Sequence, residues 1–457
     1  MKSTFVKSSE VVSHKIRFDS KHYLTDDAYL SMIIERHSNQ CAVLSELAEV
    51  FNPPVFKRQF CKKTNRSVEY FQSSDVPMST ESSPVNIYKG QAENLNLLVA
   101  KGDILITGFG TIGYTRLVSK WQDGVCYANN VCRVKTYDNV HSGYVYAFLS
   151  SKFGWAQLNK NASGSVVRYI EAPGIRKTLI PKFPDSFQAE VDNLIQESSR
   201  LREEANDKLK EAKSRLIDFC NQPFSKSNGI KCNSIKISNI RKSLNTRFDP
   251  PIYINDGVDW MAHIKKETVL LGDIDVKTWY PGIFKRIYVK KGLPYIKGSS
   301  VFNINPFRSC DHLSSARTPM LDELWLTDGL LLITCAGAVG LVKMITKEYE
   351  DKGAIGSPDI IRLSSKDALF TTEYLFTYLQ LPAVYDYMQS LKYGSVIERF
   401  DIANVETIPV VKPTIELSGE ITELIKDYKQ CMYHAFNAEE KATKMVENEI
   451  EKWNKTN

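Results

Sequence analysis

A glycine pattern in the first third of the chain could support phosphate chemistry. Gly108-Phe109-Gly110-Thr111-Ile112-Gly113 matches the GxGxxG spacing of dinucleotide-binding loops. Such loops bind a pyrophosphate because a helix begins directly after them and presents its N-terminus to the phosphates. Residues 114–120 instead contain β-branched side chains that favour a strand. We therefore predict a tight strand–loop–strand turn, whose glycines supply positive φ or a close backbone approach.

Two proline pairs could indicate methyl transfer. Asn52-Pro53-Pro54-Val55 is similar to the NPP(Y/F) motif of amino-methyltransferases, and Asp249-Pro250-Pro251-Ile252 is a second near match. The final aromatic residue, which stacks on a flipped base, is missing from both. The glycine-containing cofactor loop expected upstream is missing as well. The sequence therefore argues against methyl transfer by this chain.

No other catalytic constellation stands out, and we expect a chain without catalytic residues of its own. The seven histidines are scattered, and the nine cysteines form no CxxC pair. This usage argues for a reducing cytoplasm, without a zinc site or disulfide framework. The first 18 residues lack the apolar core of a signal peptide, and the longest apolar run, 330–342, is too short to span a bilayer. We expect a cytoplasmic protein that does not contact membranes.

An internal repeat dominates the sequence. Seven segments recur in the same order at offsets between 225 and 230 residues. The first copies are Arg17-Phe18-Asp19, Phe56-Lys57-Arg58, 70–76, 102–107, 110–113, 164–167 and 179–181; the second copies are Arg247-Phe248-Asp249, Phe284-Lys285-Arg286, 295–301, 329–334, 337–340, 394–397 and 407–409. A fixed order over more than 200 residues predicts two similar units.

Each unit reads as α+β, with a mixed or antiparallel sheet. Residues 25–50 are predicted to be helical and residues 55–140 β-rich, with strands at 102–107 and 131–134. Residues 143–158 are predicted to form a helix. Its second copy covers 373–388, where Pro382 could break or kink it.

Both copies end in a long amphipathic helix. Residues 187–219 place apolar side chains at steps of three and four, with one slip near Ala205, and residues 419–453 do the same. Neither helix could bury this stripe alone. We predict that the two pack against each other as an antiparallel coiled coil. The alternative is that each stripe packs on its own globular unit.

The charge follows the repeat. The chain carries a net charge of +6, and Lys and Arg outnumber Asp and Glu by 22 to 15 in residues 1–177 and by 24 to 20 in residues 221–414. The two long helical stretches are mildly acidic. Basic blocks can contact a polyanion, whereas the acidic helices would not.

The ordered series of segments resembles the specificity subunit of type I restriction-modification enzymes. The residues that carry the resemblance are Gly102-Asp103-Ile104-Leu105-Ile106-Thr107 followed by the glycine loop, Tyr127-Ala128-Asn129-Asn130, and the segment 143–151, together with their second copies. The second copy departs from the pattern, with Leu330 in place of the acidic residue and Cys335-Ala336 in place of Gly108-Phe109.

The resemblance implies two target recognition domains, each reading half of a split, asymmetric DNA site. It places them at residues 1–186 and 221–415, with conserved spacer helices at 187–220 and 416–457. It implies double-stranded DNA as a partner, together with methyltransferase subunits, two in our prediction, and restriction subunits reached through the complex. S-adenosylmethionine would be held by the methyltransferase partner, so this chain itself would bind no cofactor.

We expect the DNA contacts to come from basic and amide-bearing residues near the repeated loops. Lys and Arg would mainly neutralise phosphates, while Asn, Gln and some Arg could read base edges. The candidates are Lys57, Arg58, Lys62, Lys63, Arg66, Gln72, Ser73, Ser74, Asn129 and Asn130, and in the second copy Lys285, Arg286, Lys290, Lys291, Lys297, Ser299 and Ser300. Two other functions stay open: specificity for another phage-defence or methylation complex, and a self-contained methyltransferase or nuclease.

Overall fold

A computed structural model describes residues 25–80, 82–164, 168–227, 234–242, 246–394 and 398–453. These described residues form two compact units: unit 1 combines those up to Glu203 with those from His434 onward, and unit 2 takes those from Glu204 to Tyr433. The first-copy segment Arg17-Phe18-Asp19 and the segments 165–167 and 395–397 of the repeat lie outside the described residues.

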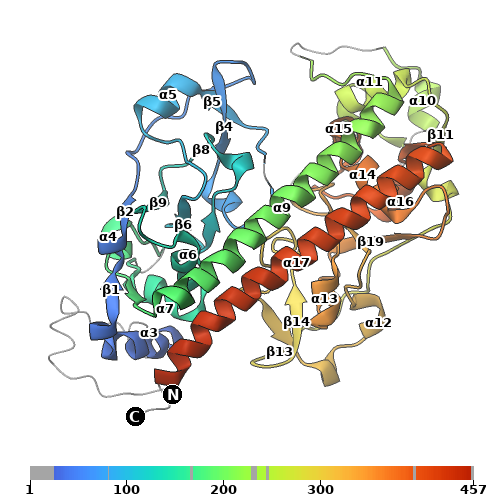
Figure 1. Cartoon of the computed structure of the whole chain (residues 1–457). Helices are drawn as coiled ribbons and strands as arrows, with labels where there is room; N and C mark the ends of the chain where they lie inside the picture. Colours follow the sequence, from blue (N-terminus) through green and yellow to red (C-terminus); the bar gives the residue numbers. More distant parts are fainter. Residues whose placement is uncertain are drawn as a thin grey trace. The chain divides into compact units, whose positions relative to one another are not determined.

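Unit 1 contains two four-stranded sheets, one with more residues in its strands, called the larger sheet, and one with fewer, called the smaller sheet (Figure 1). The larger sheet is antiparallel, in the order β2 (Ala48–Phe51), β9 (Val131–Thr136), β6 (Ile104–Thr107) and β7 (Thr115–Leu117). The smaller sheet has the order β3 (Phe60–Cys61), β5 (Asn86–Tyr88), β4 (Ser67–Phe71) and β8 (Cys126–Tyr127), and its β4–β8 pair is parallel. A third pair joins β1 (Cys41–Val43) to β10 (Leu179–Pro181).

Unit 2 repeats this topology strand for strand. Its larger sheet has the order β12 (Val276–Trp279), β19 (Ile360–Ser365), β16 (Leu331–Thr334) and β17 (Val342–Met344). Its smaller sheet has the order β13 (Tyr288–Val289), β15 (Asp311–Leu313), β14 (Leu293–Ile296) and β18 (Ile355–Gly356), with β14 and β18 parallel. The remaining pair joins β11 (Thr268–Leu270) to β20 (Pro409–Val411). The two units predicted from the repeat therefore share one fold.

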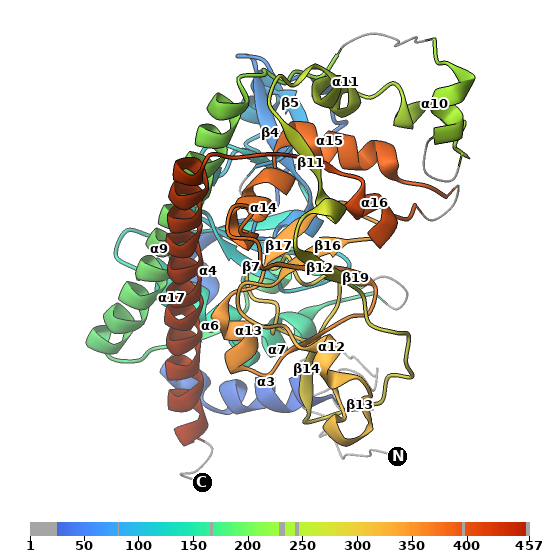
Figure 2. The ribbon, with the colours of Figure 1, turned by 90° about the vertical axis from the view of Figure 1, so that its right-hand side faces the viewer.

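Each unit also contains several short helices. Unit 1 has α3 (Asp26–Arg36), α4 (Leu44–Leu47), α5 (Lys89–Asn94), α6 (Ser142–Ser150), α7 (Lys152–Asn161) and α8 (Ala172–Ile175). Unit 2 has α10 (Ile237–Lys242), α11 (Asp256–His263), α12 (Leu321–Leu324), α13 (Lys347–Asp351), α14 (Thr372–Leu379), α15 (Pro382–Leu391) and α16 (Ile402–Glu406), with α11 lying beside α15 (Figure 2).

Two of the predicted helices are shorter than the sequence suggested. The predicted helix 25–50 ends at Arg36, and the remainder forms β1, α4 and β2. Residues 143–158 form two helices, because Ser151 leaves the helical conformation and its side chain caps α7 by accepting from the N–H of Gly154. The break predicted at Pro382 is confirmed, with the proline in the first turn of α15.

The two long helices are confirmed as α9 (Asp185–Cys220) and α17 (Ile415–Trp453), and each helix has part of its length in each unit. The predicted slip near Ala205 is wrong, because Val191, Ser198, Ala205 and Ala212 are all buried at an unbroken spacing. Three leucines at the predicted three- and four-residue steps, Leu194, Leu201 and Leu209, are only half-buried.

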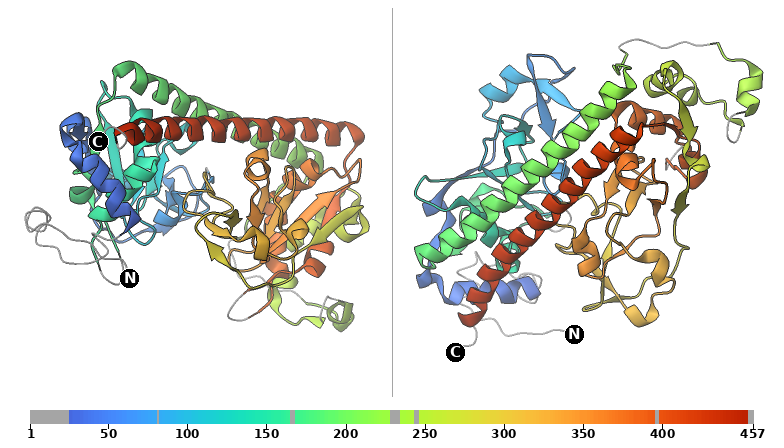
Figure 3. Two further views of the ribbon diagram at one scale, coloured as in Figure 1. Left: turned by 90° about the horizontal axis from the view of Figure 1, so that it is seen from below. Right: turned by 45° about the vertical axis from the view of Figure 1, so that its right-hand side comes forward.

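Within each unit, the portions of α9 and α17 pack side by side (Figure 3). In unit 2 Arg215 pairs with Glu420 at 2.7 Å and Lys208 with Asp427 at 3.1 Å, a register that only antiparallel helices give. In unit 1 the Ser198 hydroxyl donates to the carbonyl of Ala435 at 2.7 Å. Arg202 forms an ion pair of 2.6 Å with buried Glu439, which also accepts from Tyr146. Both helix portions therefore join the core of the unit they lie in.

Candidate nucleic-acid interface

The predicted basic residues gather on the smaller sheet of each unit. In unit 1 they flank β3 and the turn that leads to β4, and all five side chains are exposed: Lys57, Arg58, Lys62, Lys63 and Arg66. In unit 2 the corresponding segment flanks β13 and reaches the end of β14, where Lys285, Lys290, Lys291 and Lys297 are exposed and Arg286 is half-buried. The repeat thus presents two basic segments on equivalent strands.

An arginine lies over a buried tyrosine in both segments. The guanidinium of Arg58 is 5.8 Å from the ring centre of Tyr70, and its Nε donates to the tyrosine hydroxyl at 2.6 Å. The guanidinium of Arg286 lies 5.7 Å from the ring centre of Tyr295. Burial raises the pKa of Tyr70, while its hydrogen bond to Arg58 lowers it. Each tyrosine therefore holds a cation in a fixed place beside an inner strand of the smaller sheet.

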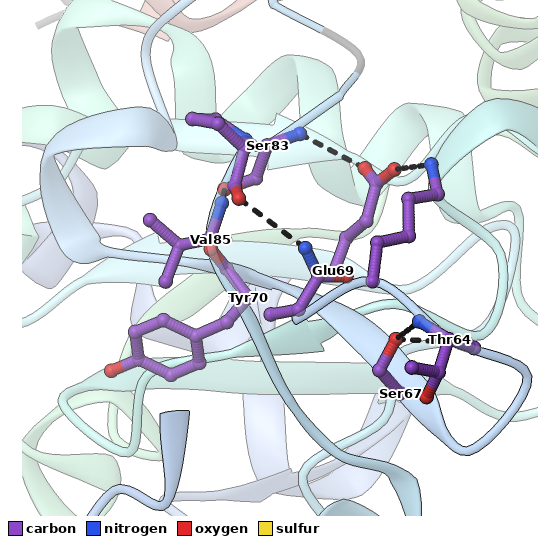
Figure 4. Close-up of polar contacts among 9 residues, drawn as sticks. Thr64, Ser67, Glu69, Tyr70, Ser83 and Val85 are labelled. Carbon is purple, nitrogen blue, oxygen red and sulfur yellow. Dashed lines mark hydrogen bonds and ion pairs between the residues drawn. The ribbon is translucent and has the colours of Figure 1, made fainter. Parts of the chain in front are cut away.

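Two of the predicted lysines already have carboxylate partners. Lys63 pairs with Glu69 at 3.1 Å, and the same carboxylate accepts from the backbone N–H of Ser83 (Figure 4). Lys297 pairs with Asp311 at 2.6 Å, and this hydrogen bond raises the pKa of Lys297. A lysine that is already paired has less to gain from binding a phosphate, so these two are the weaker candidates.

A turn fixes the basic segment of unit 1. The Ser67 hydroxyl accepts from the N–H of Thr64 at 2.8 Å and donates to the Thr64 carbonyl at 2.9 Å (Figure 4). The N–H of Lys89, in the neighbouring helix α5, donates to the carbonyl of Arg66. These bonds hold the backbone while the side chains of Lys62 and Arg66 extend into solvent.

The predicted polar loops serve mainly to close turns. The N–H of Gln72 donates to the Asp75 carboxylate at 2.7 Å, and Ser73 and Ser74 lie in the short helix that follows. In unit 2 the Ser300 hydroxyl donates to the carbonyl of Lys297 at 3.1 Å. The side chains of Gln72, Ser74 and Ser299 remain exposed, whereas Ser73 and Ser300 are half-buried.

Asn129 and Asn130 lie in the loop between β8 and β9, which joins the smaller sheet to the larger one. Their backbone carbonyls accept from Asn52 Nδ2 and from the N–H of Gly108, respectively. Both side chains are half-buried, and Asn130 Oδ1 is buried without a hydrogen-bond partner among the described residues. The counterpart of Asn130 is Asp359, which pairs with Arg286 at 3.4 Å.

A fully buried arginine holds this loop in each unit, and we did not single it out from the sequence. Arg133 donates to the carbonyls of Leu97, Tyr127, Ala128 and Val131. Arg362 donates to the carbonyls of Gly356, Ser357 and Ile360. Burial lowers the pKa of each to about 10, so both remain protonated at neutral pH. An arginine within an apolar strand in both copies of the repeat was the available signal.

The glycine loop has no helix after it, as predicted. It connects antiparallel strands β6 and β7, and Gly110 and Gly113 have φ values of +74° and +85°. The equivalents Gly337 and Gly340 have φ values of +74° and +81°, so both copies need residues that tolerate the left-handed region. Phe109 in this loop stacks on Tyr169, with ring centres 5.6 Å apart.

Neither a metal centre nor a membrane span emerges from the described parts of the chain. Within those ranges, no group of three or more His, Cys, Asp or Glu side chains is arranged to bind a metal ion. No helix described there has both the length and the apolar character required to cross a bilayer.

Neither a family model nor a curated sequence matches the chain. Solved structures similar to it include the S subunit of a type I restriction-modification system from M. genitalium, at 13% identity over 90% of this chain and 95% of that chain, with a TM-score of 0.34. The HsdS subunit from Thermoanaerobacter tengcongensis is 15% identical over 90% and 95% of the two chains, with a TM-score of 0.27. The type IIG restriction endonuclease BpuSI is 10% identical over 41% of this chain and 30% of its own, with a TM-score of 0.30. The first two are specificity subunits, the class of protein that the sequence resembles.

Proposed function

We propose that this chain is the DNA-specificity subunit of a type I restriction-modification complex. It binds a split, asymmetric site on double-stranded DNA and carries out no catalytic step itself. Methyltransferase subunits, two in this proposal, dock on it and bring restriction subunits with them. The methyl donor S-adenosylmethionine belongs to the methyltransferase, and the complex works in the cytoplasm.

The observation that carries the proposal is the repetition of one basic segment in two units of the same topology. Each segment has exposed lysines and an arginine over a buried tyrosine. In each unit a buried arginine also holds the loop that joins the smaller sheet to the larger one. Exposed Lys and Arg side chains on a fixed backbone suit phosphate contacts, and two such surfaces suit two half-sites.

In this proposal residues 1–186 and 221–415 are the two target recognition domains, and 187–220 and 416–457 are the spacer helices. The helices would act as an antiparallel coiled coil that sets the distance between the half-sites. Their continuity supports this role, because both α9 and α17 run without interruption from one unit into the other.

The first test is co-expression with the neighbouring methyltransferase, followed by sequencing of methylated bases in the host DNA. We expect a split site whose methylation requires both proteins. The purified chain alone, incubated with DNA and labelled S-adenosylmethionine, should transfer no methyl groups. Methyl transfer by the isolated chain would instead favour a self-contained methyltransferase.

A second test addresses the spacer. Seven residues inserted in α9 after Glu203 and seven in α17 after Tyr433 preserve the spacing of the buried positions. The insertion adds about 10 Å of helix, or about three base pairs of DNA. We expect both half-sites to be kept and the gap between them to grow. An active variant with the original gap would refute the spacer role.

A further inference from the structure

An aliphatic side chain is exposed at the same place in both units. Val55 is 88% exposed and Ile283 is 90% exposed. Each lies four residues after the end of the first strand of the larger sheet, at Phe51 and Trp279 respectively, and directly precedes a Phe-Lys-Arg sequence. We refer to Val55 and Ile283 as the two aliphatic tips.

Packed neighbours on both sides hold each tip in place. Two residues before them, Pro53 and Pro281 are buried. One residue after them, Phe56 packs against the cluster around Tyr70, and Phe284 packs against the cluster around Tyr295. A β-branched side chain on a backbone fixed at both ends has few rotamers left, so little conformational entropy is lost when it makes a contact.

Each tip also lies beside cations. Lys57 and Lys285 are exposed two residues after their tips, and the next residues are the arginines over the buried tyrosines. Leaving a branched aliphatic group in water contributes nothing to folding. Its recurrence at one position of the repeat, next to the same cations, indicates a contact outside the chain.

We propose that Val55 and Ile283 contact base edges of duplex DNA, with the C5-methyl group of thymine as the preferred partner. The proposal rests on the proposed DNA-binding function and adds a residue-level mechanism of readout. The thymine methyl is the apolar group that base edges present in the major groove. The adjacent Lys-Arg pair would bind phosphates on either side and hold the tip against the bases.

The test compares the full-length chain with Val55→Ser and Ile283→Ser in selection from a random duplex library. Ile415→Ser is the matched control, because Ile415 is also β-branched and is 80% exposed at the start of α17. We expect each tip variant to lose its preference for thymine at one position of one half-site. The loss should be about four-fold for each methyl contact removed, and the control should select the wild-type site.

A chemical variant of the DNA completes the test. Replacing the selected thymine with uracil removes only the methyl group, and it should weaken wild-type binding by the same factor. The serine variant should not respond to this replacement, since the two changes remove one contact. A wild-type response that persists in the serine variant would overturn the inference.

Three further outcomes separate this inference from the proposed function and from a protein-docking role. If the wild-type chain selects a site and both tip variants select the same site equally well, only the inference fails. If the wild-type chain selects no site, the DNA-binding function itself fails and the inference with it. Tip variants that lose co-purification with the methyltransferase but keep their DNA preference would make the tips a protein-docking surface, which also overturns the inference.

Discussion

The two units share one fold but stabilise it with different polar contacts. In unit 1 the buried carboxylate of Asp103 lies 4.0 Å from Lys135 and accepts from the N–H of Ala100. Unit 2 has Leu330 in place of Asp103 and Ser364 in place of Lys135, and Leu330 packs in an apolar cluster. Both members of the ion pair are therefore replaced together.

The buried arginine, in contrast, is kept in both units. Arg133 and Arg362 each have no exposed surface, and both donate to carbonyls of the loop between the two sheets, at Ala128 and Ser357 respectively. A buried ion pair can often be exchanged for apolar residues with little change in stability. Carbonyls that converge on one point need a planar group with several donors, and only arginine provides it. The fold therefore requires the buried arginine but tolerates the loss of the Asp103–Lys135 ion pair.

The loop that this arginine holds differs in charge between the units. Asn130 in unit 1 is neutral, whereas Asp359 in unit 2 pairs with Arg286. The arginine over the tyrosine therefore has an acidic partner only in unit 2, as far as the described residues go. Under the proposed function, such a difference would suit two half-sites of different sequence.

The largest effect that we predict comes from removing the buried arginines. Arg133→Ala and Arg362→Ala should each lower the free energy of unfolding by about 3–5 kcal/mol, because several buried carbonyls lose their donor. Arg133→Ala should cost more, since Arg133 serves four carbonyls and Arg362 three.

Hydrogen exchange in β9 and β19 measures this difference unit by unit, which matters because two units need not unfold together. Arg133→Lys and Arg362→Lys keep the charge but not the planar donor group, so they should not restore protection. A loss below 1 kcal/mol in both alanine variants would contradict the role assigned to the arginines.

The next largest effect is predicted for exchanging the Asp103–Lys135 ion pair and its apolar replacement between the units. Leu330→Asp should destabilise unit 2 by about 2–4 kcal/mol, because it buries a carboxylate without the lysine that unit 1 provides. Adding Ser364→Lys should recover part of this loss. The matched change in unit 1, Asp103→Leu, should cost less than about 1.5 kcal/mol.

Burial raises the pKa of Asp103, and the hydrogen bond from Ala100 together with nearby Lys135 and Arg133 lowers it. A carboxyl whose pKa is higher in the folded state stabilises the fold most when protonated, so this contribution is lost as the pH rises through the folded pKa. Above that pH, the free energy of unfolding of Asp103→Leu relative to the wild type should be at its highest, as measured by denaturant unfolding. A wild type that gains stability over Asp103→Leu as the pH rises from acid to neutral would contradict this sign.

The sequence predicted the repeat, the long helices and the strand–loop–strand glycine turn, because apolar spacing and glycine positions are local signals. It could not predict that residues 25–50 contain β1 and β2, since those strands form only by pairing with β10 and β9, more than 80 residues away. It also could not show that Lys63 and Lys297 have acidic partners, or that Val55 and Ile283 project outward. Those facts depend on which strands lie side by side.

A moderate effect is predicted for the cations beside the tips. Lys57→Ala with Arg58→Ala should weaken DNA binding about ten-fold and reduce the slope of log affinity against log salt by about two. Lys285→Ala with Arg286→Ala should reduce the slope less, because Asp359 already compensates part of the charge of Arg286. Titrations at several salt concentrations measure both slopes. Equal slopes for wild type and both double variants would remove these residues from the interface.

The smallest predicted effect separates lysines that have acidic partners from lysines that extend freely into solvent. Lys62→Ala should lower the salt slope by about one, as expected for one lost phosphate contact. Lys63→Ala should lower it less, because Lys63 must leave Glu69 before it can bind a phosphate. The same contrast should hold in unit 2 between Lys290→Ala and Lys297→Ala, since Lys297 is paired with Asp311. Glu69→Gln provides the control, because it frees Lys63 without removing it and should strengthen binding slightly. If Lys63→Ala and Lys297→Ala weakened binding more than their neighbours do, both ion pairs would have to open on DNA, and the paired lysines would be the main phosphate contacts.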